Sequence, residues 1–203
     1  MEDVLPEATE SQSKRARLQL SEDLRSCVND ATFSDVSFQV GERTVPAHKV
    51  VLASRSPVFA AMFRPDSTMR ESATNRVVIE DIDADVFVEF LHFVYTGEAP
   101  RIDDMAAALL VAADKYDVSD LKDLCGQVLA AQLSVEDCVS TLILADVHSA
   151  EPLRRAAIDF IVRRAAVVVD TSGWKALTRH PNLINDVFVL LAKSSLIKSD
   201  PRG

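Results

Sequence analysis

The chain has 203 residues, 48% of them hydrophobic, and a formal net charge of −9. This length suits one large domain or two small ones with a real hydrophobic core. The acidic balance argues against sequence-independent binding of nucleic acid, because contacts to phosphates need clustered lysines and arginines.

Cysteines and apolar stretches indicate the compartment. Cys27, Cys125 and Cys138 are widely spaced, and none belongs to a C-x-x-C pair. This pattern is typical of reduced thiols in the cytosol or nucleus, and it argues against a cysteine-rich zinc module. The N-terminus lacks the apolar stretch of a secretory signal, and charges interrupt every apolar run before membrane-spanning length. We therefore expect a protein of the nucleus, the cytoplasm or both, with no membrane partner.

Residues 1–17 are polar and are expected to form a disordered tail. The basic run KRAR at 14–17 is either a nuclear import signal or part of a solvated tail. After it, Leu20, Leu24 and Cys27 fall at helical spacing. This short amphipathic helix packs either on its own domain or on a second subunit.

Strand signals follow. Val36, Phe38 and Val40 alternate with polar residues, which predicts a strand, and the turn at Gly41 predicts a hairpin with the next run. A third strand is expected over 76–81.

Helix signals lie between and after these strands. Ser56 followed by Pro57 is typical of a helix start, with serine as N-cap and proline at the first position. A second helix is expected to begin after Asp83 and to end at Gly97. Two more are expected up to residue 133.

From Ser134 onward the sequence predicts only helices. The sequence therefore predicts an α+β domain over 18–133, a helical extension over 134–193 and a C-terminal tail over 194–203.

No motif for catalysis or metal binding stands out. None of the four histidines has a cysteine or a second histidine at metal-ligand spacing, and no phosphate loop or nucleophile elbow is present. We expect no catalytic residue, no metal and no cofactor, and an enzyme stays the disfavoured alternative.

His48 is expected to be structural, because it lies where a strand gives way to a helix and an imidazole can donate from one nitrogen and accept at the other. Asp35, at the entry to the first strand, is a candidate buried partner for His48 or Lys49. Simple turn chemistry at Asp35 is the equal alternative.

Several long stretches in order resemble the BTB/POZ family: FSDVSF at 33–38, AHKVVLASRSPVFAAMF at 47–63, NRVVIEDIDADVFVEFLHFVYTGEAP at 75–100 and LLVAADKYDVSDLKDLC at 109–125. Residues 133–161 and 170–177 are similar to the BACK-type helices of the speckle-type POZ group. The resemblance implies a BTB/POZ fold, a small three-stranded sheet capped by helices, followed by a BACK-type extension.

The resemblance also implies a function, that of a dimeric adaptor that binds cullin-3 and so builds a ubiquitin ligase. The family's motif for the cullin, a hydrophobic residue, any residue and then glutamate, matches Met69-Arg70-Glu71. An ordinary exposed loop is the alternative for this segment.

The same resemblance assigns self-association. Leu20, Leu24, Cys27 and Val51 match the family's dimer face, and Phe188 matches an aromatic position that supports higher-order assembly. Cys27 stands where relatives have a larger leucine, so it would bury less apolar surface. Each of these residues could equally belong to the chain's own core.

Members of the speckle-type POZ group usually carry a MATH domain ahead of the BTB domain, whereas only a short tail precedes it here. A fragment and a natural form without a substrate reader both stay open. In the second case the chain could act as a regulatory module that pairs with MATH-BTB relatives without recruiting a ligase.

Overall fold

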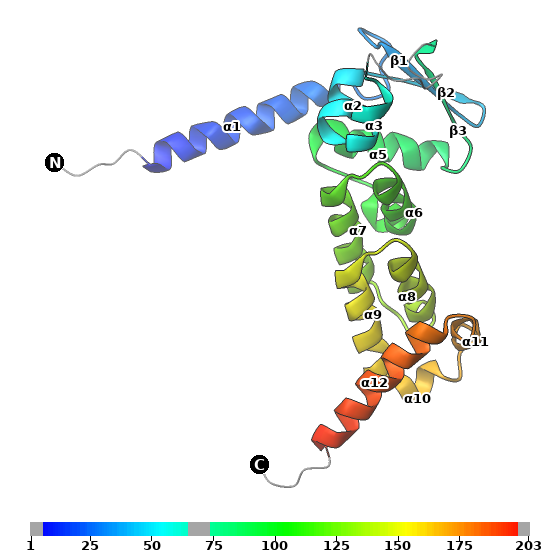
Figure 1. Cartoon of the computed structure of the whole chain (residues 1–203). Helices are drawn as coiled ribbons and strands as arrows, with labels where there is room; N and C mark the ends of the chain where they lie inside the picture. The colour runs from blue at the N-terminus through cyan, green and yellow to red at the C-terminus, as the bar shows by residue number, and fades with distance from the viewer. Residues whose placement is uncertain (1–5, 65–73, 199–203) are drawn as a thin grey trace, which may run out of the picture. The chain divides into compact units, whose positions relative to one another are not determined.

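The computed structural model describes residues 6–64 and 74–198 (Figure 1). The chain divides into two compact units, residues 1–119 and 120–203.

The first helix is longer than expected. Helix α1 covers Pro6–Arg25, so the interpretation of residues 1–17 as a disordered tail is wrong from residue 6 onward. The segment 6–17 lacks glycine and is rich in alanine, glutamate, glutamine, lysine and arginine, which favour helix, and its proline stands at the first position, where its missing N–H costs nothing.

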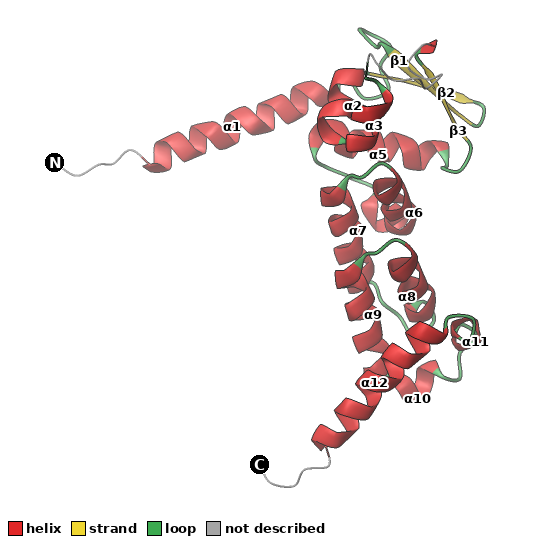
Figure 2. Ribbon diagram, in the orientation of Figure 1, coloured by secondary structure: helices red, strands yellow, loops and turns green. Residues whose placement is uncertain are grey.

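The sheet of the first unit has three strands, β1 (Val36–Val40), β2 (Arg43–Ala47) and β3 (Arg76–Ile79), in the order β2-β1-β3 (Figure 2). The antiparallel pair β1 and β2 forms the expected hairpin, and β3 pairs with β1 in parallel. Gly41 makes the tight turn possible, because its φ of 58° lies in the left-handed region.

Over the described residues, the first unit also contains α2 (Lys49–Arg55), α3 (Pro57–Met62), α5 (Ala84–Thr96) and α6 (Ile102–Lys115), and α7 (Ser119–Ala131) begins at its end. The predicted caps are confirmed. The Ser56 side chain accepts a hydrogen bond from the N–H of Phe59, the Asp83 carboxylate accepts one from Asp85, and Gly97 ends α5 in the left-handed conformation.

An aromatic cluster forms the core between sheet and helices. The ring of Phe38, on β1, lies 4.9 Å from that of Phe87 and 5.6 Å from that of Phe59. The ring of Tyr116 stacks on Phe59 with centroids 4.5 Å apart. All four side chains are buried.

The second unit is helical and contains most of α7 together with α8 (Cys138–Val147), α9 (Glu151–Arg163), α10 (Ala165–Val168), α11 (Trp174–Leu177) and α12 (Pro181–Lys198). Its main core cluster is aliphatic apart from one thiol: Cys138, Val139, Leu142, Ala157, Ile158, Ile161, Val168, Leu177, Leu183 and Val187. Ahead of α8, the N–H of Asp137 donates to Ser134 Oγ at 3.1 Å, and Ser134 Oγ donates to Asp137 Oδ2 at 2.8 Å.

The two compact units meet at residues 119–120, ahead of the domain boundary that we predicted at 133–134. Helix α7 packs within the second unit; a Cβ at Gly126 would lie 3.7 Å from Leu153 Cβ on α9, an ordinary van der Waals contact. The domain limits read from the sequence remain a prediction about the family's boundaries.

Candidate functional site

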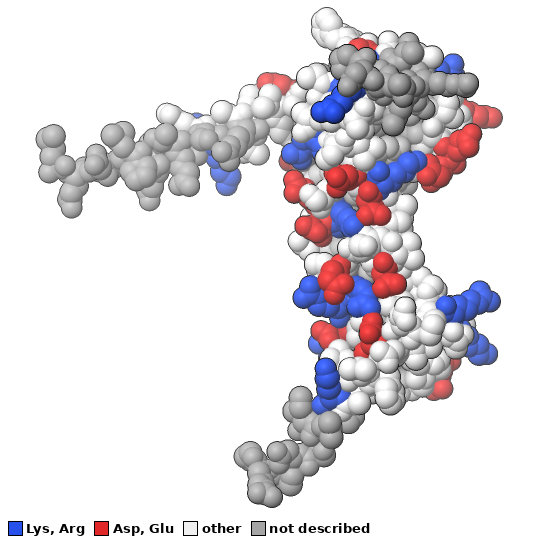
Figure 3. Space-filling view, in the orientation of Figure 1, with Lys and Arg blue, Asp and Glu red and all other residues white. Residues whose placement is uncertain are grey.

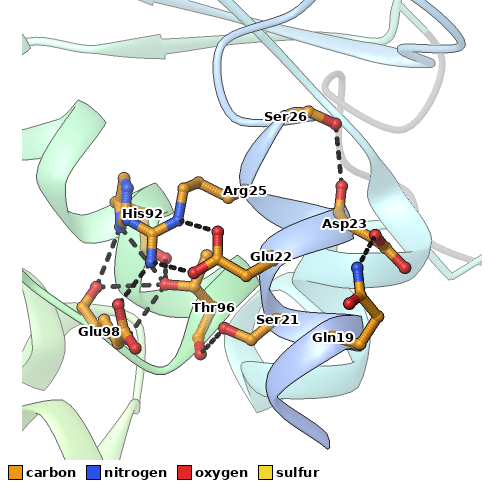
Figure 4. A network of polar contacts seen from close by, with 9 residues as sticks. All are labelled: Gln19, Ser21, Glu22, Asp23, Arg25, Ser26, His92, Thr96 and Glu98. Atoms are coloured by element: carbon orange, nitrogen blue, oxygen red, sulfur yellow. Dashed lines mark hydrogen bonds and ion pairs between the residues drawn. The ribbon is translucent and has the colours of Figure 1, made fainter. Parts of the chain in front are cut away.

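The last turns of α1 are fixed to the end of α5 by polar contacts (Figure 4). Ser21 Oγ donates to the carbonyl of Thr96 at 2.9 Å, and Arg25 Nη2 lies 2.6 Å from Glu98 Oε2. Thr96 Oγ1 in turn accepts from the N–H of Glu98 at 3.1 Å, so the turn that carries the glutamate is itself held. These contacts give this part of α1 a defined position on its own unit.

The fixed end of α1 forms one wall of an apolar groove. The groove measures about 440 Å³, and its apolar lining includes Leu20, Leu24, Val50, Val51 and Tyr95. Leu20 is 60% exposed and Val50 is 74% exposed. Exposed apolar side chains gathered from two helices, α1 and α2, are typical of a surface that another protein covers.

Three of the four predicted dimer residues, Leu20, Leu24 and Val51, come together in this groove, whereas Cys27 does not line it. Helix α1 ends at Arg25, so Cys27 lies half-buried in the turn that follows, where its N–H donates to the carbonyl of Leu24.

Sequence reasoning missed Val50. The available signal was its position two residues before the buried Leu52, because positions i and i+2 of a helix face opposite ways.

His48 links three segments of the first unit. Its Nδ1 and its backbone N both lie 2.9 Å from the Tyr95 hydroxyl, and its Nε2 lies 2.9 Å from the carbonyl of Thr32. A carbonyl only accepts, so Nε2 carries the proton, and in the neutral ring Nδ1 accepts from the Tyr95 O–H. Burial raises the pKa of Tyr95 to about 12, so the phenol keeps this proton at neutral pH.

Of the two partners expected for Asp35, the structure confirms Lys49 and not His48. Neither ring nitrogen contacts a carboxylate; the partners are a phenol and a backbone carbonyl. The Asp35 side chain is exposed, not buried, and its Oδ1 accepts from the N–H of Lys49 at 2.7 Å. A carboxylate at this place satisfies a free N–H in the first turn of α2 and interacts favourably with the helix dipole.

The other predicted residues lie elsewhere. Phe188, on α12 of the second unit, is 65% exposed. Met69 and Glu71 lie outside the described residues.

Charges of both signs intermix on the face shown in Figure 3. Lys115 pairs with Asp81 at 2.6 Å, and Arg154 pairs with Asp146 at 2.9 Å and also with Asp186. Paired basic side chains on an acidic chain are poorly suited to holding a phosphate backbone.

Two features are absent from the described residues. No group of three or more histidine, cysteine, aspartate or glutamate side chains there is arranged to hold a metal ion. Over the same residues, no helix is long and apolar enough to cross a membrane.

Comparison with known proteins places these observations in a family. The model of the BTB/POZ domain matches residues 24–133, more than half of the chain. Among solved structures, the BTB domain of zebrafish PATZ1 is similar: it is 26% identical, the match covers 59% of this chain and 92% of that one, and the TM-score is 0.45.

The family match confirms the expected fold class, a small three-stranded sheet with helices followed by a helical region. BTB domains support protein–protein interaction and dimerisation, and they are generally without enzymatic activity. The chain belongs to the BTB/POZ domain family.

Proposed function

We propose that this protein is the adaptor subunit of a cullin-3 RING ubiquitin ligase: it dimerises through its BTB domain, binds cullin-3 and has no chemistry of its own. It would act in the nucleus, the cytoplasm or both, where its thiols stay reduced.

The observation that carries the dimeric part of the proposal is the exposed apolar groove. Leu20 and Val50 hold more than half of their surface in water although both are apolar. Since α1 is hydrogen-bonded to the end of α5, this face is already ordered in the single chain, which lowers the entropic cost of association. A second copy offers the same face, as a two-fold dimer requires.

The cullin part rests on the sequence. Met69-Arg70-Glu71 falls between α3 and β3, within the family's stretch of resemblance. A flexible methionine suits an apolar pocket on a partner, and glutamate suits a cation or a helix start.

The helical unit supports a second kind of self-association. We infer that it is a BACK-type extension of the speckle-type POZ kind and that Phe188, exposed on α12, supports higher-order assembly. Two different symmetric interfaces on one chain would join dimers into open chains, and such multivalency raises the avidity for clustered substrates.

The test of the adaptor role is the mass in solution, alone and mixed with the purified N-terminal domain of cullin-3. Light scattering on a sizing column should give twice 22.3 kDa or more for the chain, and one cullin domain bound per chain. A dimer that does not bind the cullin-3 domain would contradict the adaptor role. It would favour a regulatory module that pairs with MATH-BTB relatives.

Variants then separate the two surfaces. Met69→Ala and Glu71→Ala should weaken cullin binding and leave the dimer intact. Val50→Glu should break the dimer, because it puts a charge into the apolar face. Val147→Glu is the matched control, since Val147 is 64% exposed on α8 of the other unit. Loss of the dimer in both glutamate variants would argue against the groove.

A further inference from the structure

Strand β3 lies at one edge of the three-stranded sheet. Over the described residues it pairs only with β1, in the order β2-β1-β3. From 76 to 80, exposed and buried residues alternate: Val77 and Ile79 are buried, whereas Arg76, Val78 and Glu80 are exposed. The side chain of Val78 is 60% exposed. The outer face of this edge strand therefore presents an apolar side chain between one positive and one negative charge.

The backbone of β3 is directed outward at alternate residues. The N–H of Ser37, on β1, donates to the carbonyl of Asn75 at 2.9 Å. In an extended strand the N–H and carbonyl of one residue point to one edge and those of the next residue to the other, so Arg76 and Val78 direct theirs away from β1. The Thr74 hydroxyl lies 3.4 Å from the Arg76 nitrogen and 3.3 Å from its carbonyl oxygen, both longer than an ordinary hydrogen bond. Such an edge is a template for pairing with another chain.

A second copy of β3 complements this edge in antiparallel orientation. A two-fold axis beside Val78 places Val78 opposite its own copy, Arg76 opposite Glu80 of the second copy, and Glu80 opposite the second Arg76. Opposite charges directly across from each other stabilise a strand pair, and like charges destabilise it. Centring the pair on Val77 instead would place Arg76 opposite Val78, and both charge pairs would be lost.

The surroundings of Glu80 suit an incoming guanidinium. Glu80 lines a hollow of about 720 Å³ at the end of the strand, and Glu42 lines it as well. The basic side chain in this hollow, Arg43, already pairs with Asp85. The carboxylate of Glu80 therefore meets the Arg76 of a second copy in an acidic environment, which favours the pair.

We propose that the outer edge of β3 binds the same edge of a second copy of this chain, so that one sheet continues across two molecules. Charge order, exposed valine and outward backbone groups all fit the same two-fold axis. The surface shares no residue with the apolar groove between α1, α2 and α5, and it needs no cullin. Because β3 has only four residues, the contact is small and the association is weak.

The experiment is sedimentation equilibrium of the full chain over a series of concentrations. Arg76→Glu and Glu80→Arg are measured singly, combined in one chain, and as an equimolar mixture of the two single variants. Arg179→Glu, an equal change of charge at an exposed residue of the helical unit, is the matched control. Thermal unfolding of each variant reports the fold.

The average mass of the wild type should rise with concentration. Each single variant places two like-charged pairs across the axis and should weaken this association at least about tenfold. The mixture and the double variant restore opposite charges at both positions, and each should associate within about twofold of wild type. Arg179→Glu should behave as wild type.

A backbone variant tests the pairing without changing charge. Val78→Pro removes an N–H that points away from β1, so the ladder with β1 is kept while the hydrogen bond to a second copy is lost. We expect it to associate as weakly as the single charge variants and to remain folded.

Three results would overturn the proposal. A wild-type mass that does not change with concentration would exclude a second copy as the occupant of this edge. Single charge variants that associate like wild type would exclude the charge pairs. A mixture no better associated than its two components would exclude this antiparallel register.

Discussion

The BTB unit builds its core around a cluster of aromatic rings, whereas the main core cluster of the helical unit consists of aliphatic side chains and one thiol. In the first unit the rings of Phe38, Phe59 and Tyr116 come from a strand, a helix and the end of another helix. In the second, Leu142 and Ile158 come from neighbouring helices α8 and α9.

The difference follows from the shapes to be filled. A small sheet covered by several helices leaves a wide space that large rings fill, whereas helices packed on helices interlock with branched aliphatic side chains. The two units also carry different aromatic chromophores. Both tyrosines of the chain, Tyr95 and Tyr116, lie in the BTB unit, and the single tryptophan, Trp174, lies in the helical unit. Each unit thus has its own spectroscopic reporter.

The largest expected effect comes from the aromatic cluster. Phe59→Ala should lower the free energy of unfolding of the BTB unit by about 3–5 kcal/mol, because Phe59 is fully buried and contacts several other rings. Denaturation followed by the near-ultraviolet circular dichroism of the tyrosines measures it. Leu142→Ala, the counterpart in the helical unit, should instead move the transition seen by Trp174 fluorescence, by about 2–5 kcal/mol. If each variant moved both transitions equally, the units would unfold as one.

Alkaline pH should destabilise the helical unit first. Burial raises the pKa of the Cys125 thiol from 9.0 to about 12. The neutral thiol is favoured in the folded state, so its contribution is fully present below pH 9.0 and is lost as the pH rises toward 12. We expect a loss of about 1.4 kcal/mol per pH unit, measured by urea denaturation of the unit that contains Trp174. Cys125→Ala should remove most of this slope; an unchanged slope would contradict the assignment.

The BTB unit should follow at higher pH. Burial raises the pKa of Tyr95 from 10.0 to about 12, and it raises the pKa of Tyr116 further. The unfolded chain loses these protons first, so the stability of this unit should fall above pH 10, by about 1.4 kcal/mol per pH unit for each tyrosine. Tyr95→Phe should reduce the slope. If the BTB unit lost stability at a lower pH than the helical unit, the expected order of the two units would be wrong.

Two serine hydroxyls that accept a hydrogen bond from a backbone N–H, one in each unit, should contribute differently to stability. Ser56 is 1% exposed; its Oγ accepts from Phe59 N–H and donates to the carbonyl of Tyr116. Ser56→Ala leaves two buried groups without partners and should cost about 1–3 kcal/mol. Ser134→Ala, at a half-buried position ahead of α8, should cost about 0.5–1 kcal/mol, because water replaces the lost contact. Equal losses in thermal unfolding would show that burial does not set the difference.

The smallest effect is on thiol accessibility and leaves stability unchanged. Cys125 and Cys138 are buried and the pKa of each thiol is raised by burial, whereas Cys27 is half-buried. A thiol reagent at neutral pH should modify Cys27 first, as mass spectrometry of the native protein would show. Faster labelling of either buried cysteine would mean that the helical unit opens locally.

Local signals in the sequence predicted most of the elements. The hairpin at Gly41, the caps at Ser56 and Asp83 and the stop at Gly97 were all readable, because turn and cap preferences depend on a few neighbouring residues. The extent of α1 was not, because a polar segment rich in helix formers reads equally well as a solvated tail.

The candidate site was predicted only in part. Leu20, Leu24 and Val51 could be named from the sequence, yet the exclusion of Cys27 and the inclusion of Val50 depend on where α1 ends and how it lies on α5.

By itself the sequence determined the fold class and the order of strands and helices, because hydrophobic periodicity and capping act over a few residues. Only the tertiary structure decided which side chains meet. The Tyr95 hydroxyl reaches His48 across 47 positions of chain, and Asp35 serves Lys49 rather than the histidine. Such pairings follow from the packing of the sheet against α2 and α5, and no local sequence pattern predicts them.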